Sequence, residues 1–396
     1  MRGLRLGRVI SMRMLRLWMM VALLGAASMS FAQEATAPAW LAQVKSQAAA
    51  AMKAQTLPSI SVAVWNDGHV EAFALGWADV EQKVPATPES LYRLASISKP
   101  ITAVAVMRLA RSYRLGLDAR AELYCPAFTG HPEVTARMLL GHRSGVHHYK
   151  DDDAAQNTHH FATMDDAVRN FAADPLEFPA GRQQLYTSYG FTVLGCEVAG
   201  ASGTDYARYV ERKVLHPLHM KQTVVDDESV EQPGRVRFYT LKDGKLAPAH
   251  ALDTSDRLPG GGWLSTPTEM VEFASGVEHL LGPEWTHLMW RETSHPGEHL
   301  RYALGWELGT LQGEFMVAHG GSQSGTSTFL LLVPKRKVAV AVFTNRDGDD
   351  IRAVAKKMAE TILGPASPGN AEPRKRPAKK DSVRYASVAS HAAGTR

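Results

Sequence analysis

Alternating apolar and polar positions predict a β-hairpin near the start of the chain and a second pair of strands near its end. Residues 59–76 alternate around a turn at residues 66–68, where Asn, Asp and Gly follow one another. Strand patterns return at residues 329–333 and 338–344, separated by a turn that begins with Pro. We therefore expect strands at both ends of the sequence.

Helical patterns occupy the middle of the chain. The mostly apolar run at residues 101–109 is long enough for a buried helix, and residues 205–215 predict another, with Thr204 as its N-cap. A closing helix is expected at residues 350–363. Strands at both ends with helices between them predict one sheet built from the two chain ends, with a mainly helical insertion over about residues 104–260.

The composition is that of an ordinary globular protein, and its positive charge is concentrated at the ends. Hydrophobic residues make up 45% and charged residues 21% of the 396 residues, enough apolar side chain for a substantial core. Residues 1–32 contain five arginines and no acid, and residues 365–396 contain seven basic residues and two acids. The formal charge of +4 therefore leaves about −6 for residues 33–364, which gives no reason to expect a nucleic-acid partner.

The first residues resemble an export signal. Their arginines form a basic segment, residues 17–27 are apolar, and small residues stand at the cleavage site. We expect a signal peptide over residues 1–32, cleavage after Ala32, and a periplasmic or secreted protein with one folded domain at residues 33–364. The tail at residues 365–396, rich in Pro, Ala, Ser and basic residues, is expected to be disordered, and its contact with a membrane stays open.

The sequence contains two cysteines, Cys125 and Cys196. Cys196 lies in an apolar stretch typical of a helix interior, and no neighbouring histidine is placed to activate either thiol. We therefore expect two buried free thiols, and it stays open whether they pair.

The tetrapeptide Ser96-Ile97-Ser98-Lys99 fits the pattern S-x-x-K and stands where a helix is expected to begin. One helical turn separates its first and last residues, so both side chains lie on the same face. If burial keeps the amine of Lys99 neutral, the amine can take the proton of Ser96 during nucleophilic attack. Chance supplies about one such match in a chain of this composition, so the alternative is an ordinary helix cap with a solvated lysine.

A second motif, Tyr186-Thr187-Ser188-Tyr189-Gly190, precedes another apolar helical pattern. A tyrosine beside a Ser–Lys pair can relay a proton to a leaving group. By itself, this segment is more typical of a tyrosine packed where a loop meets a helix.

A third motif, His319-Gly320-Gly321-Ser322, adjoins a strand pattern. Two glycines on an edge strand would let a substrate backbone approach closely, and the backbone N–H of Ser322 could complete an oxyanion hole. A turn between strands with a satisfied histidine is the alternative.

The order and spacing of the three motifs are similar to those of the penicillin-binding-protein and class C β-lactamase superfamily, whose motifs are S-x-x-K, Y-x-N and K-T-G or H-x-G. The resemblance covers about residues 56–363 and includes the runs LLGHRSGV at residues 139–146 and GGGWLSTP at residues 260–267. It implies an α/β (α+β) fold of the serine β-lactamase and DD-peptidase type, with an antiparallel sheet flanked by helices. It also implies a serine hydrolase that uses no metal and no organic cofactor.

Carried over by motif, the resemblance implies a role for each matching residue. Ser96 would be the acylated nucleophile, Lys99 the general base and Tyr186 the proton relay. The backbone N–H groups of Ser96 and Ser322 would form the oxyanion hole, and His319 would face the substrate. The residues expected in the substrate and oxyanion site are Ser188, His319, Gly320, Gly321 and Ser322. The activator of the deacylating water stays open between Tyr186 and Lys99.

Two departures from the superfamily's motifs bear on the substrate. Ser188 stands where Y-x-N has Asn, and His319 stands where K-T-G has Lys. A hydroxyl and a mostly neutral imidazole are weaker anchors for an anion. We therefore expect a peptide, amide or ester substrate, with peptidase or amidase activity favoured over esterase activity. True β-lactamase or D-Ala-D-Ala carboxypeptidase activity ranks below both of these activities.

Four short segments also resemble the mitochondrial serine β-lactamase-like proteins, at residues 95–99, 144–149, 174–176 and 318–321. Those proteins assemble into filaments, so the resemblance implies self-association as a homo-oligomer or a filament. A monomer in light scattering would contradict this expectation.

Three other functions are weighed against a Ser–Lys hydrolase. A catalytically silent binding protein on the same fold, recognising cell-wall peptide or a protein partner, is the alternative from a different class. A metal site is considered because histidines and aspartates crowd residues 147–160, but no H-E-x-x-H helix accompanies them, which favours a polar loop. A lipase-type hydrolase would need G-x-S-x-G, which residues 320–325 do not match.

Overall fold

The computed structural model describes residues 37–150 and 156–365. The chain divides into two units, residues 1–41 and 42–396, and the second unit holds the fold. The expected signal peptide and residues 366–396 of the expected tail lie outside the described residues. Within the described ranges, no helix combines the length and the apolar character needed to cross a membrane.

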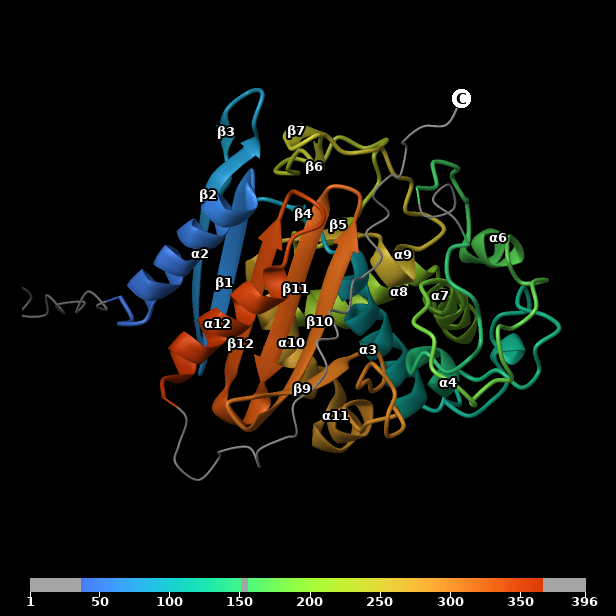
Figure 1. The fold of residues 1–396 in the computed structure, drawn as a ribbon. Coiled ribbons are helices and arrows are strands. Elements are labelled where there is room, and N and C mark those ends of the chain that lie inside the picture. Colours follow the sequence, from blue (N-terminus) through green and yellow to red (C-terminus); the bar gives the residue numbers. More distant parts are fainter. Residues whose placement is uncertain (1–36, 151–155, 366–396) are drawn as a thin grey trace, which may run out of the picture. The chain divides into compact units, whose positions relative to one another are not determined.

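A seven-stranded antiparallel sheet is built from the two ends of this unit (Figure 1). Its strands, in chain order, are β1 (Ser59–Asn66), β2 (His69–Asp79), β3 (Val84–Pro85), β9 (Glu307–Leu311), β10 (Glu314–Gln323), β11 (Thr326–Val333) and β12 (Val338–Thr344). The spatial order is β3-β2-β1-β12-β11-β10-β9. The expected hairpin is β1 and β2, and β1 pairs on its other side with the C-terminal strand β12. The expectation of one sheet from both chain ends is confirmed.

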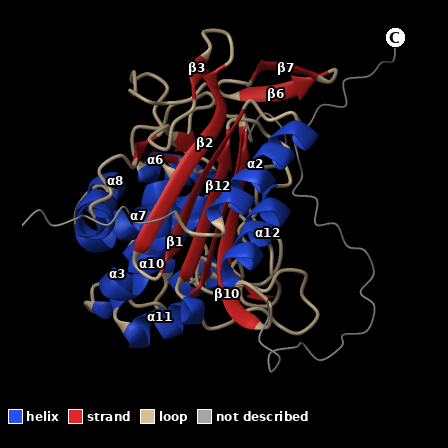
Figure 2. Cartoon of the chain, turned by 90° about the vertical axis from the view of Figure 1, so that its left-hand side faces the viewer, coloured by secondary structure: helices blue, strands red, loops and turns tan. Residues whose placement is uncertain are grey.

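Helices cover both faces of the sheet. α10 (Pro267–Leu281) packs on one face, whereas α2 (Leu41–Gln55) and α12 (Ile351–Leu363) lie on the other (Figures 1 and 2). The strands β11 and β12 are buried along their whole length because both of their faces are covered. α12 is the expected closing helix, and the carboxylate of Asp350 caps it by accepting the N–H of Ala353.

A mainly helical region lies between two short strands, β4 (Tyr92–Arg93) and β8 (Trp263–Ser265), which pair with each other. Its helices are α3 (Ser98–Arg111), α4 (Ala136–Leu140), α6 (Met164–Arg169), α7 (Tyr189–Ser202), α8 (Tyr206–Val210) and α9 (Leu258–Gly261). The strand β5 (Val224–Val225) and the hairpin of β6 (Tyr239–Lys242) and β7 (Lys245–Pro248) also belong to it, and α11 (Pro283–Met289) follows α10. α3 is buried from Ser98 to Met107, because small and apolar side chains surround most of this stretch.

The helix expected at residues 205–215 is present in altered form. α8 ends at Val210 and continues as a π-helical turn over Glu211–Leu215. The N-cap is Asp205, whose carboxylate accepts the N–H of Arg208, so the expectation of a Thr204 cap is wrong. Aspartate is the stronger cap because its negative charge also interacts favourably with the positive end of the helix.

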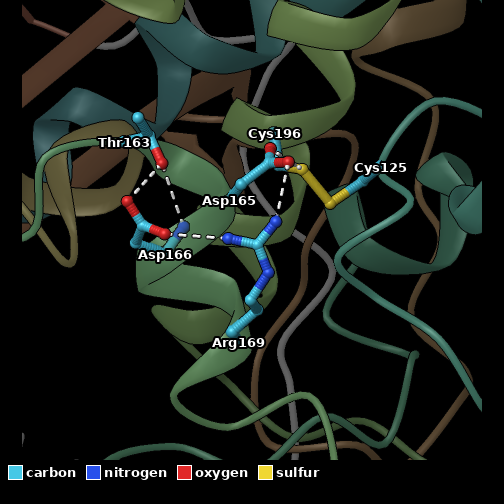
Figure 3. Close-up of a disulfide and its surroundings, with 6 residues drawn as sticks. All are labelled: Cys125, Thr163, Asp165, Asp166, Arg169 and Cys196. Atoms are coloured by element: carbon cyan, nitrogen blue, oxygen red, sulfur yellow. Dashed lines mark hydrogen bonds and ion pairs between the residues drawn. A yellow bond between two sulfur atoms is a disulfide. The ribbon is translucent and has the colours of Figure 1, made fainter.

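Cys125 and Cys196 form a disulfide, with 2.00 Å between the sulfur atoms and 5.2 Å between the Cα atoms (Figure 3). The expectation of two free thiols is therefore wrong, although both residues are buried as expected. The pairing follows from tertiary packing. A Cβ added at Gly200 of α7 would lie 1.8 Å from the carbonyl oxygen of Tyr124. This glycine lets the loop that carries Cys125 lie directly against the helix that carries Cys196.

Candidate active site

Ser96 stands where the sheet meets the helical region. The preceding residue, Ala95, has a positive φ of 47°, and a 3-10 turn over Ala95–Ile97 leads directly into α3. A positive φ is uncommon for a residue with a side chain, and it persists where the surrounding packing enforces it. From Ser90 to Met107 every residue is buried except Ser96, which is partly exposed. The turn therefore presents the predicted nucleophile, alone in this stretch, to solvent.

Lys99 lies fully buried one turn further along α3. Its Nζ is 3.0 Å from the Oγ of Ser96, 3.2 Å from the Oγ of Ser188 and 2.9 Å from the carbonyl oxygen of Gly260. Burial, together with the charge of Arg257, holds the pKa of Lys99 well below its usual range. The site therefore favours a neutral amine at this position.

The contacts of this amine show what its lone pair can do. A neutral lysine has two N–H groups and one lone pair. The carbonyl oxygen of Gly260 can only accept, so it takes one N–H, and the Oγ of Ser188 can take the other. The lone pair is then left for the hydroxyl proton of Ser96, 3.0 Å away. The arrangement suits proton abstraction from the predicted nucleophile.

Tyr186 and Ser188 come from the segment that opens α7. The Nζ of Lys99 lies over the ring of Tyr186, 4.8 Å from its centre, and Tyr186 is partly exposed like Ser96. Ser188, in the place of the superfamily's Asn, is buried and bonded to Lys99. The first two motifs are thus brought together around one amine.

The third motif lies within β10, against the turn that carries Ser96. A Cβ added at Gly321 would lie 2.4 Å from the carbonyl oxygen of Leu94, so only glycine permits this approach. β10 is second from the sheet edge and not the edge strand that the motif suggested, but its pairing with β9 ends at Ala318. Beyond that point, the N–H groups of alternate residues point to an uncovered edge, because backbone groups alternate along a strand. Ser322 therefore offers an N–H that no strand of the described sheet takes.

A buried carboxylate occupies the same edge two residues earlier. The Oε1 of Glu307 accepts the backbone N–H of Gly320 at 3.2 Å. Arg352 of α12 donates to both oxygens of Glu307, at 2.5 and 3.0 Å. This side chain replaces the strand partner that β9 no longer provides, and it steadies β10 just before Ser322.

His319 is fully buried and uses both ring nitrogens within the protein. Its Nδ1 lies 2.7 Å from the carbonyl oxygen of Gly320, and its Nε2 lies 2.8 Å from the hydroxyl of Tyr302. Because a carbonyl only accepts, Nδ1 carries the proton and Nε2 accepts from Tyr302. Burial lowers the pKa of His319 to about 4, so the ring is neutral. Both ring nitrogens of His319 are thus engaged within the protein, and the expectation that this residue faces the substrate stays a prediction.

Three further residues surround this centre that the motifs did not assign to it. The Nδ1 of His148 accepts the backbone N–H of Ser188 at 3.3 Å. Ser188 is also hydrogen-bonded to Tyr149, whose ring centre lies 4.3 Å from the guanidinium carbon of Arg257. Arg257 is buried and paired with its neighbour Asp256. The sequence signals were two adjacent aromatic rings and a charged pair before a glycine run, and only the fold brings them together.

The segment weighed as a metal site is engaged in other contacts. The Nε2 of His147 lies 2.8 Å from a carboxylate oxygen of Asp174, and the Nδ1 of His160 lies 3.0 Å from one of Asp253. Residues 37–150 and 156–365 contain no group of three His, Cys, Asp or Glu side chains placed to hold a metal ion. The aspartates at residues 151–153 lie outside these ranges.

Comparison with known proteins places the chain in a family. Its sequence matches the Beta-lactamase family over residues 44–390. It is 27% identical, over 420 residues and 76% of each chain, to the human Serine beta-lactamase-like protein LACTB, mitochondrial. The resemblance that the three motifs suggested is therefore confirmed.

Solved structures agree in fold. The octameric penicillin-binding protein homologue from Pyrococcus abyssi is 26% identical, with a TM-score of 0.72 over 81% of this chain and 77% of that chain. The D-amino acid amidase from Ochrobactrum anthropi SV3 is 19% identical, with a TM-score of 0.71 over 81% of this chain and 99% of that chain, and at this identity only the fold is compared. From the family match and the shared fold together, this chain belongs to the Beta-lactamase family of serine hydrolases.

Proposed function

We propose that this protein hydrolyses amide or ester bonds through an acyl-enzyme formed on Ser96. The observation that carries the proposal is the 3.0 Å separation between the Oγ of Ser96 and the buried Nζ of Lys99. Burial disfavours the charged ammonium, so this lysine can act as the base that an S-x-x-K hydrolase needs. The partial exposure of Ser96 gives a substrate access to the nucleophile.

The first chemical step makes the acyl-enzyme. The Oγ of Ser96 attacks the substrate carbonyl carbon, and its proton passes to the lone pair of Lys99. Charge developing on the carbonyl oxygen is stabilised by the backbone N–H groups of Ser96 and Ser322. The bond to the leaving group then breaks, and the proton passes from Lys99 through the hydroxyl of Tyr186 to the leaving amine or alkoxide. In the second step water attacks the acyl carbonyl, which releases the acid and returns the proton to Ser96.

The neutral character of the site supports a substrate without a carboxylate beside the scissile bond. Burial lowers the pKa of His148 to about 3 and that of His319 to about 4, so neither ring is a cation at neutral pH. Arg257 is buried against Asp256. β-Lactams and D-Ala-D-Ala peptides both carry a carboxylate and would lack an anchor here. Peptidase or amidase activity on uncharged groups therefore comes first, and esterase activity second.

The test uses the intact mass of the protein after incubation with a fluorophosphonate probe. Wild type is expected to gain one probe, and Ser96→Ala none. The matched control is Ser98→Ala, which removes a neighbouring buried hydroxyl and should leave labelling unchanged. If a folded wild-type sample stays unlabelled by this probe and by a second acylating probe, the protein is a binding protein on this fold and the proposal fails.

We also propose that the protein is exported. A disulfide between Cys125 and Cys196 supports this, because such bonds persist mainly in oxidising compartments. N-terminal sequencing of the mature protein should begin at Gln33. A full-length product retained with cytosolic markers would contradict export.

Self-association is a further proposal. The Pyrococcus abyssi homologue, which is similar in fold, is octameric. Light scattering of purified protein would show an oligomer if the similarity extends to assembly, and a monomer would contradict it.

A further inference from the structure

His148 lies beside the Ser–Lys pair, and its ring is held in place by several contacts. Its Nδ1 accepts the backbone N–H of Ser188 at 3.3 Å, and the side chain of Ser188 bonds to Lys99. The ring centre of His148 lies 4.3 Å from that of Tyr149, and 6.1 Å from that of Tyr186, which it meets edge to face. The imidazole is therefore set in one position next to the groups that would attack a substrate.

The hydrogen bond from Ser188 fixes which nitrogen of His148 carries the proton. Because an N–H donates to Nδ1, this nitrogen has the lone pair, and the single proton of the neutral ring is on Nε2. Burial lowers the pKa of His148 to about 3, which keeps the ring neutral. Among residues 37–150 and 156–365, no group bonds to this Nε2. His148 is partly exposed, whereas Lys99 and Ser188 are buried, so this residue offers an Nε2 donor near the Ser–Lys pair.

We propose that His148 is a specificity-determining residue that donates from Nε2 to a second carbonyl oxygen of the substrate, outside the scissile bond. This inference rests on the proposed hydrolase function. N-acylated amino acids and peptides supply such an oxygen, and simple alkyl esters do not. A donor with no partner among the described residues favours substrates that bring an acceptor, because a substrate lacking one leaves a polar group desolvated and unpaired.

The same geometry excludes His148 as the general base for the deacylating water. A base needs a lone pair facing that water. The one lone pair of the neutral ring lies on Nδ1 and is occupied by the N–H of Ser188. His148 therefore recognises the substrate and does not move a proton.

The experiment compares kcat/KM for paired esters in wild type and His148→Phe, which keeps an aromatic ring but removes both the Nε2 donor and the Nδ1 acceptor of the Ser188 N–H. Any loss from the missing acceptor falls on both members of a pair, so the ratio within each pair isolates the donor. One pair shares a 4-nitrophenol leaving group and differs in the acyl part, an N-acetylated amino acid against an alkanoate of equal length. A second pair shares an acyl part and differs in the alcohol, with or without a second carbonyl. His159→Phe, a substitution at an exposed histidine, is the matched control.

We expect His148→Phe to lower kcat/KM for the carbonyl-bearing member of one pair about 10- to 100-fold more than for its partner without that carbonyl. The affected pair shows whether His148 reads the acyl part or the alcohol. His148→Gln, which restores an N–H donor, should recover part of the loss.

Equal losses for both members of each pair, or no loss, would overturn the inference. Fluorophosphonate labelling of the same samples separates the two proposals. Normal labelling without a selective loss overturns the role of His148 alone, whereas unlabelled wild type overturns the hydrolase function and with it this inference.

Discussion

The backbone N–H of Gly320 is held by the Oε1 of Glu307 at 3.2 Å, where β9 has stopped pairing with β10. The next N–H on the same edge belongs to Ser322, and the proposed mechanism assigns this group to the oxyanion. A carboxylate held by Arg352 thus takes the N–H that β9 no longer pairs, and in the proposed mechanism the following N–H is left for the substrate. In that mechanism Glu307 would act through the backbone of β10, as a positioning residue.

Replacing Glu307 by Gln should lower kcat for ester hydrolysis by about tenfold with little change in KM. The amide can still accept the N–H of Gly320, but it loses the charge that Arg352 holds, so the strand is less well fixed when charge develops on the oxyanion. Steady-state kinetics would measure the change. Glu314→Gln is the control, because Glu314 is a buried carboxylate at the other end of β10. Similar kcat values in the two variants would remove Glu307 from this role.

Replacing Arg257 by Gln should move the acidic limb of the pH–rate profile for Ser96 acylation to higher pH. The charge of Arg257 adds to burial in lowering the pKa of Lys99. Without this cation, the ammonium form persists to higher pH, and a higher pH is needed to expose the lone pair. The rate of fluorophosphonate labelling, measured against pH, would show the shift. Arg143→Gln, at a buried arginine paired with Glu298, should leave the limb in place.

Replacing Glu197 by Gln should stabilise the protein at neutral pH but not at about pH 4. Glu197 of α7 is fully buried, and its carboxyl oxygens have no partner among the described residues. Burial raises its pKa well above the usual value. As pH rises above about 4.3, the unfolded glutamate ionises while the folded one stays protonated, so the free energy of unfolding of wild type falls. Urea unfolding at both pH values would measure this, and a difference between the proteins that is constant with pH would contradict it.

Replacing both Cys125 and Cys196 by Ser should lower the free energy of unfolding by about 4 kcal/mol, the loop-closure value for a separation of 71 residues. The crosslink joins α7 to the loop that carries Cys125, and Cys196 lies about two helical turns beyond Ser188. Fluorophosphonate labelling of the folded variant should therefore continue. Chemical denaturation gives the loss, and a change below about 1 kcal/mol would show that the unfolded chain gains little freedom when the bond is absent.

The strands β1, β2, β11 and β12 could be predicted because their periodicity is local, whereas β3, β9 and β10 were not predicted. The alternation of residues 59–76 and the apolar run at residues 338–344 identify β1, β2 and β12 without reference to partners. The disulfide could not be predicted, because it depends on how closely Gly200 lets another loop approach α7. The N-cap of α8 was also not predicted, because Thr204 and Asp205 are adjacent and either side chain can cap a helix.

Some residues of the candidate site could be predicted from the sequence and others could not. Ser96 and Lys99 could be paired from sequence, since one helical turn fixes their relation. His148, Arg257 and Glu307 could not be assigned to the site, because each comes from a different segment and none belongs to the three motifs. Their relation to the centre exists only after the sheet and the helical region have packed together.

The pairing of β1 with β12 also determines how late in synthesis the sheet can form. β1 lies between β2 and β12, with Ile60 opposite Thr344. The N-terminal hairpin can therefore join the other strands of the sheet only after β12 has been synthesised. Long-range strand pairing of this kind is slow to form. Ser96, the proposed nucleophile, leaves the ribosome early, whereas the strand bearing Ser322 emerges more than two hundred residues later. If the proposed mechanism holds, the site is incomplete in a nascent chain until the strand that bears Ser322 has been made and paired.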